Sequence, residues 1–314
     1  MRRHGHTSRG RQRWRCLQCG LTGVHRRPDA RLRHTKRRAW QWLTGKASVS
    51  EIARSSDLTR RSLSKQFQII FTQRAKFVRP RSIVVLILDG IYIHGRLLMA
   101  LIGLADDRHL VWSFTNRETS GSWFELLSDL PIPTVVVCDG HSGLMPTLRA
   151  LWPKTAIQRC HFHVLKLARV YLTRQPRTLA GRELQALLWT LTSCRTPEAK
   201  DKFRNRFETW CQRHETLLSE RSHSIDDHRR KHWWYTHKKL RGVRSLLIHA
   251  LPNLFTFLDY PDCPNTTNAV EGGINAQIAE ALRLHRGLRL HQKQTLVSFV
   301  LDKINQQKTT RKFS

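Results

Sequence analysis

The clearest structural signal in this chain is the stretch SIVVLILDGIYIHGRLLMALIGLADDRHLVWSFT, residues 82–115. Its first part, SIVVLILDG, is an almost continuous apolar run and predicts a buried strand that ends at Asp89. LLMALIGLADD and HLVWSFT predict two further strands, joined by a turn at Asp106–Asp107. Three consecutive strands with short connections indicate a meander at the start of a larger sheet.

The next segments alternate between helical and strand patterns. TSGSWFELLSDL (119–130) predicts a helix, TVVVCDG (134–140) a fourth strand that ends at Asp139, SGLMPTLRALW (142–152) a helix and TAIQRC (155–160) a short fifth strand. A meander of three strands followed by a helix and a parallel strand is the order of a ribonuclease-H-like core. The expected fold class is therefore α/β.

Two aspartates share one local pattern, an apolar run followed by Asp and Gly, in LILDGIY at Asp89 and VVCDGHS at Asp139. An aspartate at the end of a buried strand must be paired, capped or bound to a cation to offset its desolvation. A turn or helix cap is the alternative for either residue alone. Carboxylates that converge on a cleft are suitable ligands for Mg²⁺ or Mn²⁺, and two such ions can activate a nucleophile and stabilise a leaving oxygen.

Beyond about Val164 the pattern becomes helical and basic as far as Asp259, and a last helical region is expected from Asn265. In this tail an apolar stripe repeats every four residues, formed by Val270, Ile274, Ile278 and Leu282. Glu271 lies beside the stripe, and Asn275 follows one turn later on the face of Glu271. Gly272 and Gly273 weaken the helix at this point.

The charge of the chain calls for a polyanionic partner. The 314 residues carry a net charge of +32, and residues 1–80 contribute +18 of it, with 21 lysines and arginines against 3 acidic residues. Nucleic acid is favoured over an anionic membrane surface, because no stretch is long and apolar enough to span a bilayer and the basic residues are widely spread. Seven scattered cysteines and the lack of a signal pattern favour a reducing cytoplasm.

Residues 49–67, VSEIARSSDLTRRSLSKQF, predict two short helices separated by a tight turn at Ser56–Asp57, with Thr59 as the N-cap of the second helix. The exposed face of that second helix would carry Arg60, Arg61, Ser64 and Lys65. Such side chains suit phosphates and base edges in a major groove, as in a helix-turn-helix. A basic helical hairpin that only packs is the alternative.

The pair Cys16-x-x-Cys19, followed by Gly20, is typical of half a zinc ribbon, which needs four ligands. Nearby His4, His6, His25 and His34 lack ribbon spacing. We interpret the pair as a partial ribbon whose first half was lost to an upstream start or truncation, and zinc binding is in doubt. The expected domains are 1–35, the ribbon-like segment; 36–78, the helix-turn-helix; and 79–314, the catalytic domain with a helical insertion at about 165–262.

Four motifs together, LDG, VVVCDGHSGL, QRCHFHVLKLAR and NTTNAVEGGINAQI, resemble the Mutator-like transposases of bacterial insertion sequences. The resemblance is greatest to the branch with an N-terminal zinc ribbon and helix-turn-helix. It implies a ribonuclease-H-like fold with a helical insertion before the glutamate helix. It also implies a DDE triad, here Asp89, Asp139 and Glu271, that holds two Mg²⁺ or Mn²⁺ ions.

The resemblance implies two further groups of functional residues. The family's Cys-x-x-His signature falls on Cys160 and His163, which would support the edge of the active site; a buried thiol and a satisfied histidine are the alternative. Trp233 lies in the insertion, where related transposases stack an aromatic ring on a flipped base. Of Trp233, Trp234 and Tyr235, we expect at least two to belong to the core of the insertion.

The expected function is that of a DNA transposase in the bacterial cytoplasm, associated with the nucleoid. Residues 1–80 would bind the terminal inverted repeats of double-stranded DNA, and the triad would cleave the ends and join them to target DNA. Assembly on paired ends implies at least a homodimer. The alternatives are a catalytically inactive or domesticated DNA-binding regulator, and a ribonuclease-H-like nuclease or resolvase that does not transpose.

Overall fold

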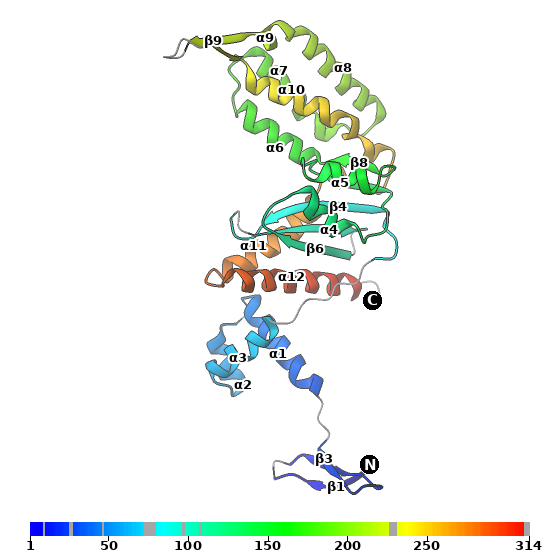
Figure 1. The fold of residues 1–314 in the computed structure, drawn as a ribbon, viewed down its shortest axis with the longest axis vertical. Helices are drawn as coiled ribbons and strands as arrows, with labels where there is room; N and C mark the ends of the chain where they lie inside the picture. Colours follow the sequence, from blue (N-terminus) through cyan, green and yellow to red (C-terminus); the bar gives the residue numbers. More distant parts are fainter. Residues whose placement is uncertain are drawn as a thin grey trace. The chain divides into compact units, whose positions relative to one another are not determined.

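The computed structural model describes residues 1–8, 10–24, 28–45, 47–71, 80–95, 98–106, 109–225 and 231–310. The chain forms two compact units, which we describe separately (Figure 1). The smaller unit comprises Met1–Arg74 together with Arg283–Gly287, and the larger comprises Ala75–Leu282 and Leu288–Ser314.

The smaller unit holds an antiparallel three-stranded sheet and three helices, β1 (Arg2–His6), β2 (Gln12–Arg15), β3 (Thr22–Val24), α1 (Pro28–Leu43), α2 (Val49–Ser56) and α3 (Arg60–Phe71). The two helices predicted from the sequence are present, separated by the expected turn. Helix α2 begins with a capping box between Ser48 and Glu51 and ends at Asp57, whose backbone is left-handed. Thr59 caps α3, since its hydroxyl accepts a hydrogen bond from the Ser62 amide at 3.1 Å.

The larger unit is built on a mixed five-stranded sheet in the order β6-β5-β4-β7-β8. Its strands are β4 (Val85–Tyr92), β5 (Met99–Ala105), β6 (His109–Thr115), β7 (Val135–Cys138) and β8 (Ala156–Arg159). β4, β5 and β6 pair antiparallel, whereas β4–β7 and β7–β8 pair parallel. All five strands predicted from the apolar runs are present, and the α/β class is confirmed.

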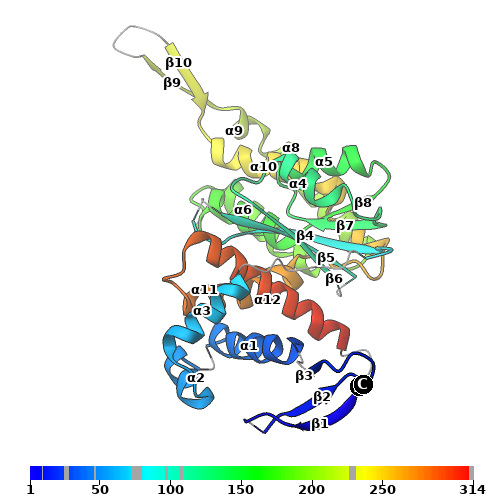
Figure 2. The same ribbon diagram turned by 60° about the horizontal axis from the view of Figure 1, so that its bottom comes forward.

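Alternation along β4 assigns its side chains to the two faces of this sheet. Leu86 and Leu88 pack in a core with Trp123 of α4 (Ser120–Leu127) and Leu148 of α5 (Leu144–Leu151). Figure 2 shows these two helices above the sheet and the C-terminal helices below it. Asp89, one residue further along β4, therefore faces away from α4 and α5.

The C-terminal part of the larger unit holds a π-helical segment (Ala269–Ile274), α11 (Asn275–Leu284) and α12 (Leu290–Thr310). The sequence predicted a regular helix through this tail, and the π-helical turn is a difference from that prediction. Gly272 and Gly273 lie in this turn, and a Cβ atom at either would meet no other atom within 4 Å. α12 lies along β6, where the Asn305 side chain exchanges two hydrogen bonds with the backbone of Leu110.

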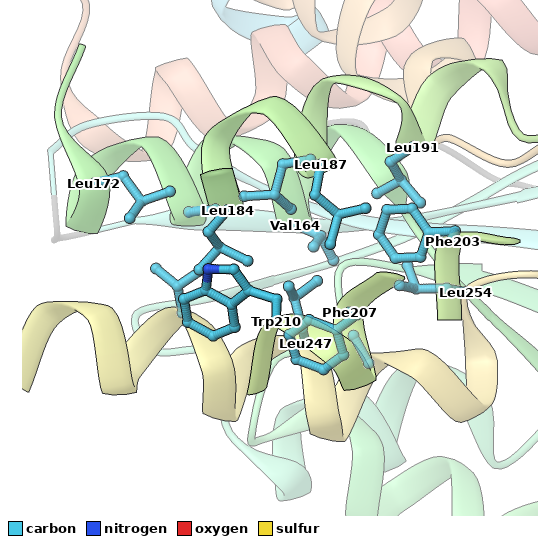
Figure 3. Packing of buried hydrophobic residues seen from close by; sticks show 14 of the residues in the cluster. Val164, Leu172, Leu184, Leu187, Leu191, Phe203, Phe207, Trp210, Leu247 and Leu254 are labelled. Carbon is cyan, nitrogen blue, oxygen red and sulfur yellow. The ribbon is translucent and has the colours of Figure 1, made fainter. Parts of the chain in front are cut away.

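Between β8 and the C-terminal helices lies a helical region with its own core (Figure 3). It comprises α6 (His161–Leu172), α7 (Leu179–Trp189), α8 (Pro197–Arg213), α9 (Glu215–Ser219) and α10 (Lys238–Ala250), with short 3-10 turns at Leu191–Ser193, Leu251–Asn253 and Thr256–Leu258. Trp210, Phe203 and Phe207 of α8 fill this core, and the Trp210 indole donates a hydrogen bond to the Ala180 carbonyl. None of the described helices combines the length and apolar character needed to cross a membrane.

The helical region also contains a β-hairpin, β9 (Arg221–Ile225) and β10 (Lys231–Tyr235), where the sequence had suggested only helix. The expectation that at least two of its three aromatic residues belong to the core is wrong. Trp233 is 51% and Trp234 44% exposed, and none of the three belongs to the core of the helical region. Residues 233 and 234 point to opposite sides of a two-stranded ribbon, so a hairpin that projects into solvent leaves both indoles accessible.

Candidate active site

The first two predicted site residues lie on neighbouring parallel strands. Asp139 directly follows β7, whereas β4 continues past Asp89, where the sequence predicted its end, as far as Tyr92. β4 and β7 pair from Val85 with Val135 to Ile87 with Val137, and this register, continued by two residues, brings Asp139 next to Asp89. Neighbouring strands are about 4.8 Å apart. The two carboxylates therefore belong to one site on two inner strands of the sheet.

The turn after β7 orients Asp139. The backbone amide of His141 donates a hydrogen bond of 2.8 Å to Asp139 Oδ1. Gly140 has a φ of 75°, and a Cβ atom there would collide with the Arg159 guanidinium group. Glycine at this position is thus required both by the backbone and by the space that Arg159 occupies.

The π-helical segment brings the third predicted carboxylate to the same place. Asn275, one turn after Glu271, donates a hydrogen bond of 3.3 Å from Nδ2 to Asp89 Oδ2, which ties the C-terminal helix to β4. Glu271 Oε1 lies 3.6 Å from Lys166 Nζ, and its Oε2 lies 4.0 Å from His163 Nε2. π-helical turns often occur at functional sites.

Mutual electrostatic effects show how near these groups are to one another. Burial raises the pKa of Asp89 from 3.8 to about 7; the positive charge of His163 opposes this, and the negative charges of Glu271 and Asp139 add to it. Asp89 is only 7% exposed. A nearly buried carboxylate beside two others is poorly stabilised as an anion without a cation.

Cys160 and His163 lie at the border of this cluster. The buried Cys160 sulfur accepts hydrogen bonds from the Thr267 backbone amide at 3.3 Å and from its hydroxyl at 3.5 Å. Burial favours the neutral thiol, but hydrogen bonds from His163 and Thr267 outweigh it and lower the pKa of Cys160. Burial likewise opposes the charged form of His163, but contact with Cys160 and the charges of Asp89 and Asp139 raise its pKa to about 9.

The donor atoms fit divalent metal ions, although the ligands are not preassembled. Glu271 Oε2 and Asn275 Oδ1 are buried oxygens without a hydrogen-bond partner, an arrangement that a cation would satisfy. Carboxylate and amide oxygens are also the ligands that Mg²⁺ prefers. Within the described ranges, however, no three His, Cys, Asp or Glu side chains stand close enough to hold an ion as they are placed.

A further carboxylate at this site, that of Glu118, was not predicted from the sequence. It lies in the link between β6 and α4, and its Oε1 atom is 3.5 Å from His141 Nδ1. Burial and the charge of Asp139 both raise its pKa. Asn116 and Arg117 separate Glu118 from the apolar run before it, so the pattern that singled out the two aspartates could not have found it.

The remaining predicted site residues lie elsewhere in the chain. Arg60, Arg61, Ser64 and Lys65 are all exposed on α3 of the smaller unit. In that unit the turn between β2 and β3 holds Cys16 and Cys19, and no third His, Cys, Asp or Glu of the described residues joins them to form a metal site. Trp233 lies on the hairpin, with the Arg221 guanidinium 4.4 Å from the centre of its ring.

Comparison with known families settles the class of protein. Residues 46–231 match the family described as "Transposase, Mutator family". The chain belongs to this family. The matched part of this Mutator-family transposase includes Asp89, Asp139, Cys160 and His163, but it ends before Glu271.

Two curated relatives are transposases of bacterial insertion sequences. The transposase for insertion sequence element ISRM5 of Rhizobium meliloti (strain 1021) is 29% identical over 188 residues, which cover 55% of this chain and 44% of the relative. The transposase for insertion sequence element IS6120 of Mycolicibacterium smegmatis is 34% identical over 94 residues, 26% of this chain and 29% of the relative. The chain thus spans less than half the length of either relative.

Proposed function

We propose that this chain is the catalytic transposase of an insertion-sequence element. It would bind the terminal inverted repeats of the element and catalyse strand cleavage and strand transfer with Asp89, Asp139 and Glu271. The fold we propose for the larger unit is a ribonuclease-H-like core with a helical insertion. The strand order, the parallel β4–β7 pair and the helical region between β8 and the π-helical segment support it.

The convergence of the three carboxylates is the observation that carries the proposal. The chain has 23 acidic residues against 55 basic ones, and three of the acidic residues lie near one another from β4, the turn after β7 and the π-helical segment. One of them is nearly buried and has a raised pKa. Strongly perturbed carboxyl groups clustered at the end of a sheet are typical of functional sites.

In the proposed mechanism Asp89, Asp139 and Glu271 hold two Mg²⁺ or Mn²⁺ ions, which supply activation of the attacking oxygen and stabilisation of the leaving oxygen when bound. Neighbouring residues of the chain hold the aspartate ligands in their orientations. Asn275 orients Asp89 through its amide, and the His141 backbone amide orients Asp139. Lys166 and His163 offset the charge of Glu271 in the present structure.

Two surfaces would bind DNA in this proposal. The first is the smaller unit, where the exposed side chains of Arg60, Arg61, Ser64 and Lys65 follow one face of α3, as in a helix-turn-helix. The second is the helical region, in which Trp233 is exposed on the hairpin. A hollow of about 910 Å³ lies at the base of the hairpin, and its lining among the described residues includes Arg174, Arg177, Lys238 and Lys239 but no acidic residue. Cations with an exposed aromatic ring suit phosphates and unstacked bases.

Two further points complete the proposal. Pairing of two element ends requires at least a homodimer, in which each copy holds one end. The proposal assigns no role to zinc, since Cys16 and Cys19 are two ligands and a structural zinc site needs four.

The test is cleavage by a Glu271→Gln variant of a duplex that carries the end of the element, with Mg²⁺ or Mn²⁺. Glutamine keeps the size of the side chain but removes one negative charge, so we expect cleavage to be abolished and DNA binding to be kept. Glu125→Gln, an exposed change on α4, is the matched control and should cut normally. Cleavage by the Glu271→Gln variant at close to the unmodified rate would exclude this residue as a ligand. An unmodified protein that binds DNA but never cuts would favour the inactive regulator.

A further inference from the structure

We propose that Glu118 is a fourth acidic ligand of the metal site, on the side of Asp139. This inference rests on the proposed function of Asp89, Asp139 and Glu271. Glu118 belongs to no part of the resemblance described above, and the structure alone brings it to the site.

The Glu118 side chain is held in one position. Its Oε1 atom accepts a hydrogen bond of 3.0 Å from the indole nitrogen of Trp123, which is completely buried in the core beneath α4. Only 13% of the Glu118 side chain is exposed. A carboxylate that is hydrogen-bonded to a buried indole keeps one orientation, whereas a glutamate on the surface samples several rotamers.

The second oxygen, Oε2, lies directly against the strand that carries Asp89. A Cβ atom on Gly90 would lie only 3.4 Å from this oxygen, so the absence of a side chain at Gly90 allows the carboxylate to approach. On the other side, a Cβ atom on Gly143 would lie 2.9 Å from the Glu118 carbonyl oxygen. Glu118 is therefore packed between the segment that follows Asp89 and the turn that follows Asp139.

Nothing in the described part of the chain neutralises Glu118 well. No lysine or arginine of the described residues forms an ion pair with it, and Oε2 accepts no hydrogen bond from them. His141 Nδ1, 3.5 Å from Oε1, already accepts a hydrogen bond of 3.1 Å from the Gly143 amide. In this geometry the lone pair of the nitrogen is in use, so the neutral imidazole presents no proton to Glu118 through Nδ1.

An enclosed carboxylate beside a second one is costly unless a cation accompanies it. A role limited to accepting the Trp123 hydrogen bond would not require a charge, since a neutral amide would serve equally. Four carboxylates, those of Asp89, Asp139, Glu271 and Glu118, would together balance the charge of two divalent ions. Glu118 and Asp139 would then share the ion on their side of the site.

The experiment measures Mn²⁺ binding to the full chain without DNA, by electron paramagnetic resonance and isothermal titration calorimetry. The unmodified protein should bind two ions. Glu118→Gln should weaken one of them at least about tenfold and leave the other, because a site built of few anionic ligands tolerates the loss of one poorly. Glutamine still accepts a hydrogen bond from Trp123, so the melting temperature should be unchanged. Glu125→Gln, which replaces an exposed acid on α4, the helix that follows Glu118, should bind as the unmodified protein does.

Unchanged Mn²⁺ binding by a folded Glu118→Gln variant would overturn the inference while leaving the triad intact. Loss of binding in Asp139→Asn but not in Glu118→Gln would overturn it as well. If the unmodified protein bound no Mn²⁺, this result would contradict both the proposed metal site and the role of Glu118 as one of its ligands. If Glu118→Gln did not fold, Trp123→Phe would decide, since it keeps the carboxylate but removes its anchor. Weaker binding of the same ion would support the inference, and unchanged affinity would contradict it.

Discussion

Replacing Asp89 by asparagine should stabilise the metal-free protein at neutral and alkaline pH. The carboxylate is buried beside Asp139 and Glu271, and these surroundings raise its pKa from 3.8 to about 7. Asparagine has nearly the same size and can accept the same hydrogen bond from Asn275 through its side-chain oxygen. The substitution therefore removes the charge and little else.

The expected size of the effect follows from the pKa. A group whose pKa is higher in the folded than in the unfolded state favours folding at low pH, and that contribution is lost as the pH rises through the folded value. Each pKa unit corresponds to about 1.36 kcal/mol, so ionised Asp89 costs up to about 4 kcal/mol above pH 7. Asp89→Asn should therefore raise the melting temperature by up to roughly 8–16 °C at pH 8, given about 2–4 °C per kcal/mol for a unit of this size.

The assay is scanning calorimetry of both proteins in EDTA at pH 4 and pH 8, read at the transition of the larger unit. The difference should be small at pH 4, where aspartate is largely protonated in the folded state, and large at pH 8. Adding Mg²⁺ at pH 8 should raise the melting temperature of the unmodified protein but not that of the variant. If the variant were no more stable than the unmodified protein at pH 8 in EDTA, the assigned burial and crowding of Asp89 would be wrong.

Three further outcomes are expected. The double substitution Arg60→Ala and Arg61→Ala should weaken binding to duplex DNA and reduce the slope of log affinity against log salt by about 0.9 for each lost phosphate contact. Metal analysis of the purified protein should find well under one zinc ion per chain, and replacing Cys16 and Cys19 by serine should not change it. Trp233→Ala should weaken binding of DNA with unpaired bases by about 1–3 kcal/mol, as expected for one lost stack, in a fluorescence titration.

A control variant or a contradicting result tests each of these three predictions. Arg54→Ala, an exposed change in the last turn of α2, should leave the salt slope closer to its original value than the α3 pair does. Stoichiometric zinc would show that histidines or a second subunit complete the site. Trp234→Ala, on the other side of the same strand, should separate a specific stack from general loss of exposed aromatic surface.

Local patterns of the sequence were sufficient to predict the five strands of the sheet and to single out two of the carboxylates. An apolar run bounded by turn residues can bury itself only as a strand or a buried helix, and the length and β-branched content of these runs favour a strand. Asp89 and Asp139 end such runs, and Asp139 does follow the end of β7, whereas β4 continues past Asp89 to Tyr92. Glu271 was assigned from the resemblance of its motif to a family, because a helix periodicity cannot distinguish a ligand from any other exposed glutamate.

Tertiary packing alone brought the other groups of the site together. Asn275 bonds to Asp89 across 186 positions of sequence, and Thr267 bonds to Cys160 across 107. Glu118 reaches the site because Trp123 holds it over a glycine on a neighbouring strand.

In two segments the observed secondary structure also differed from the helix that the sequence pattern predicted. These are the π-helical turn at Glu271 and the hairpin that carries Trp233. The spacing of apolar residues shows which side chains of a segment face the core. The π-helical turn and the hairpin depend instead on the space and the contacts that distant segments provide. The local pattern therefore predicted the elements, and the packing of those elements determined which side chains meet.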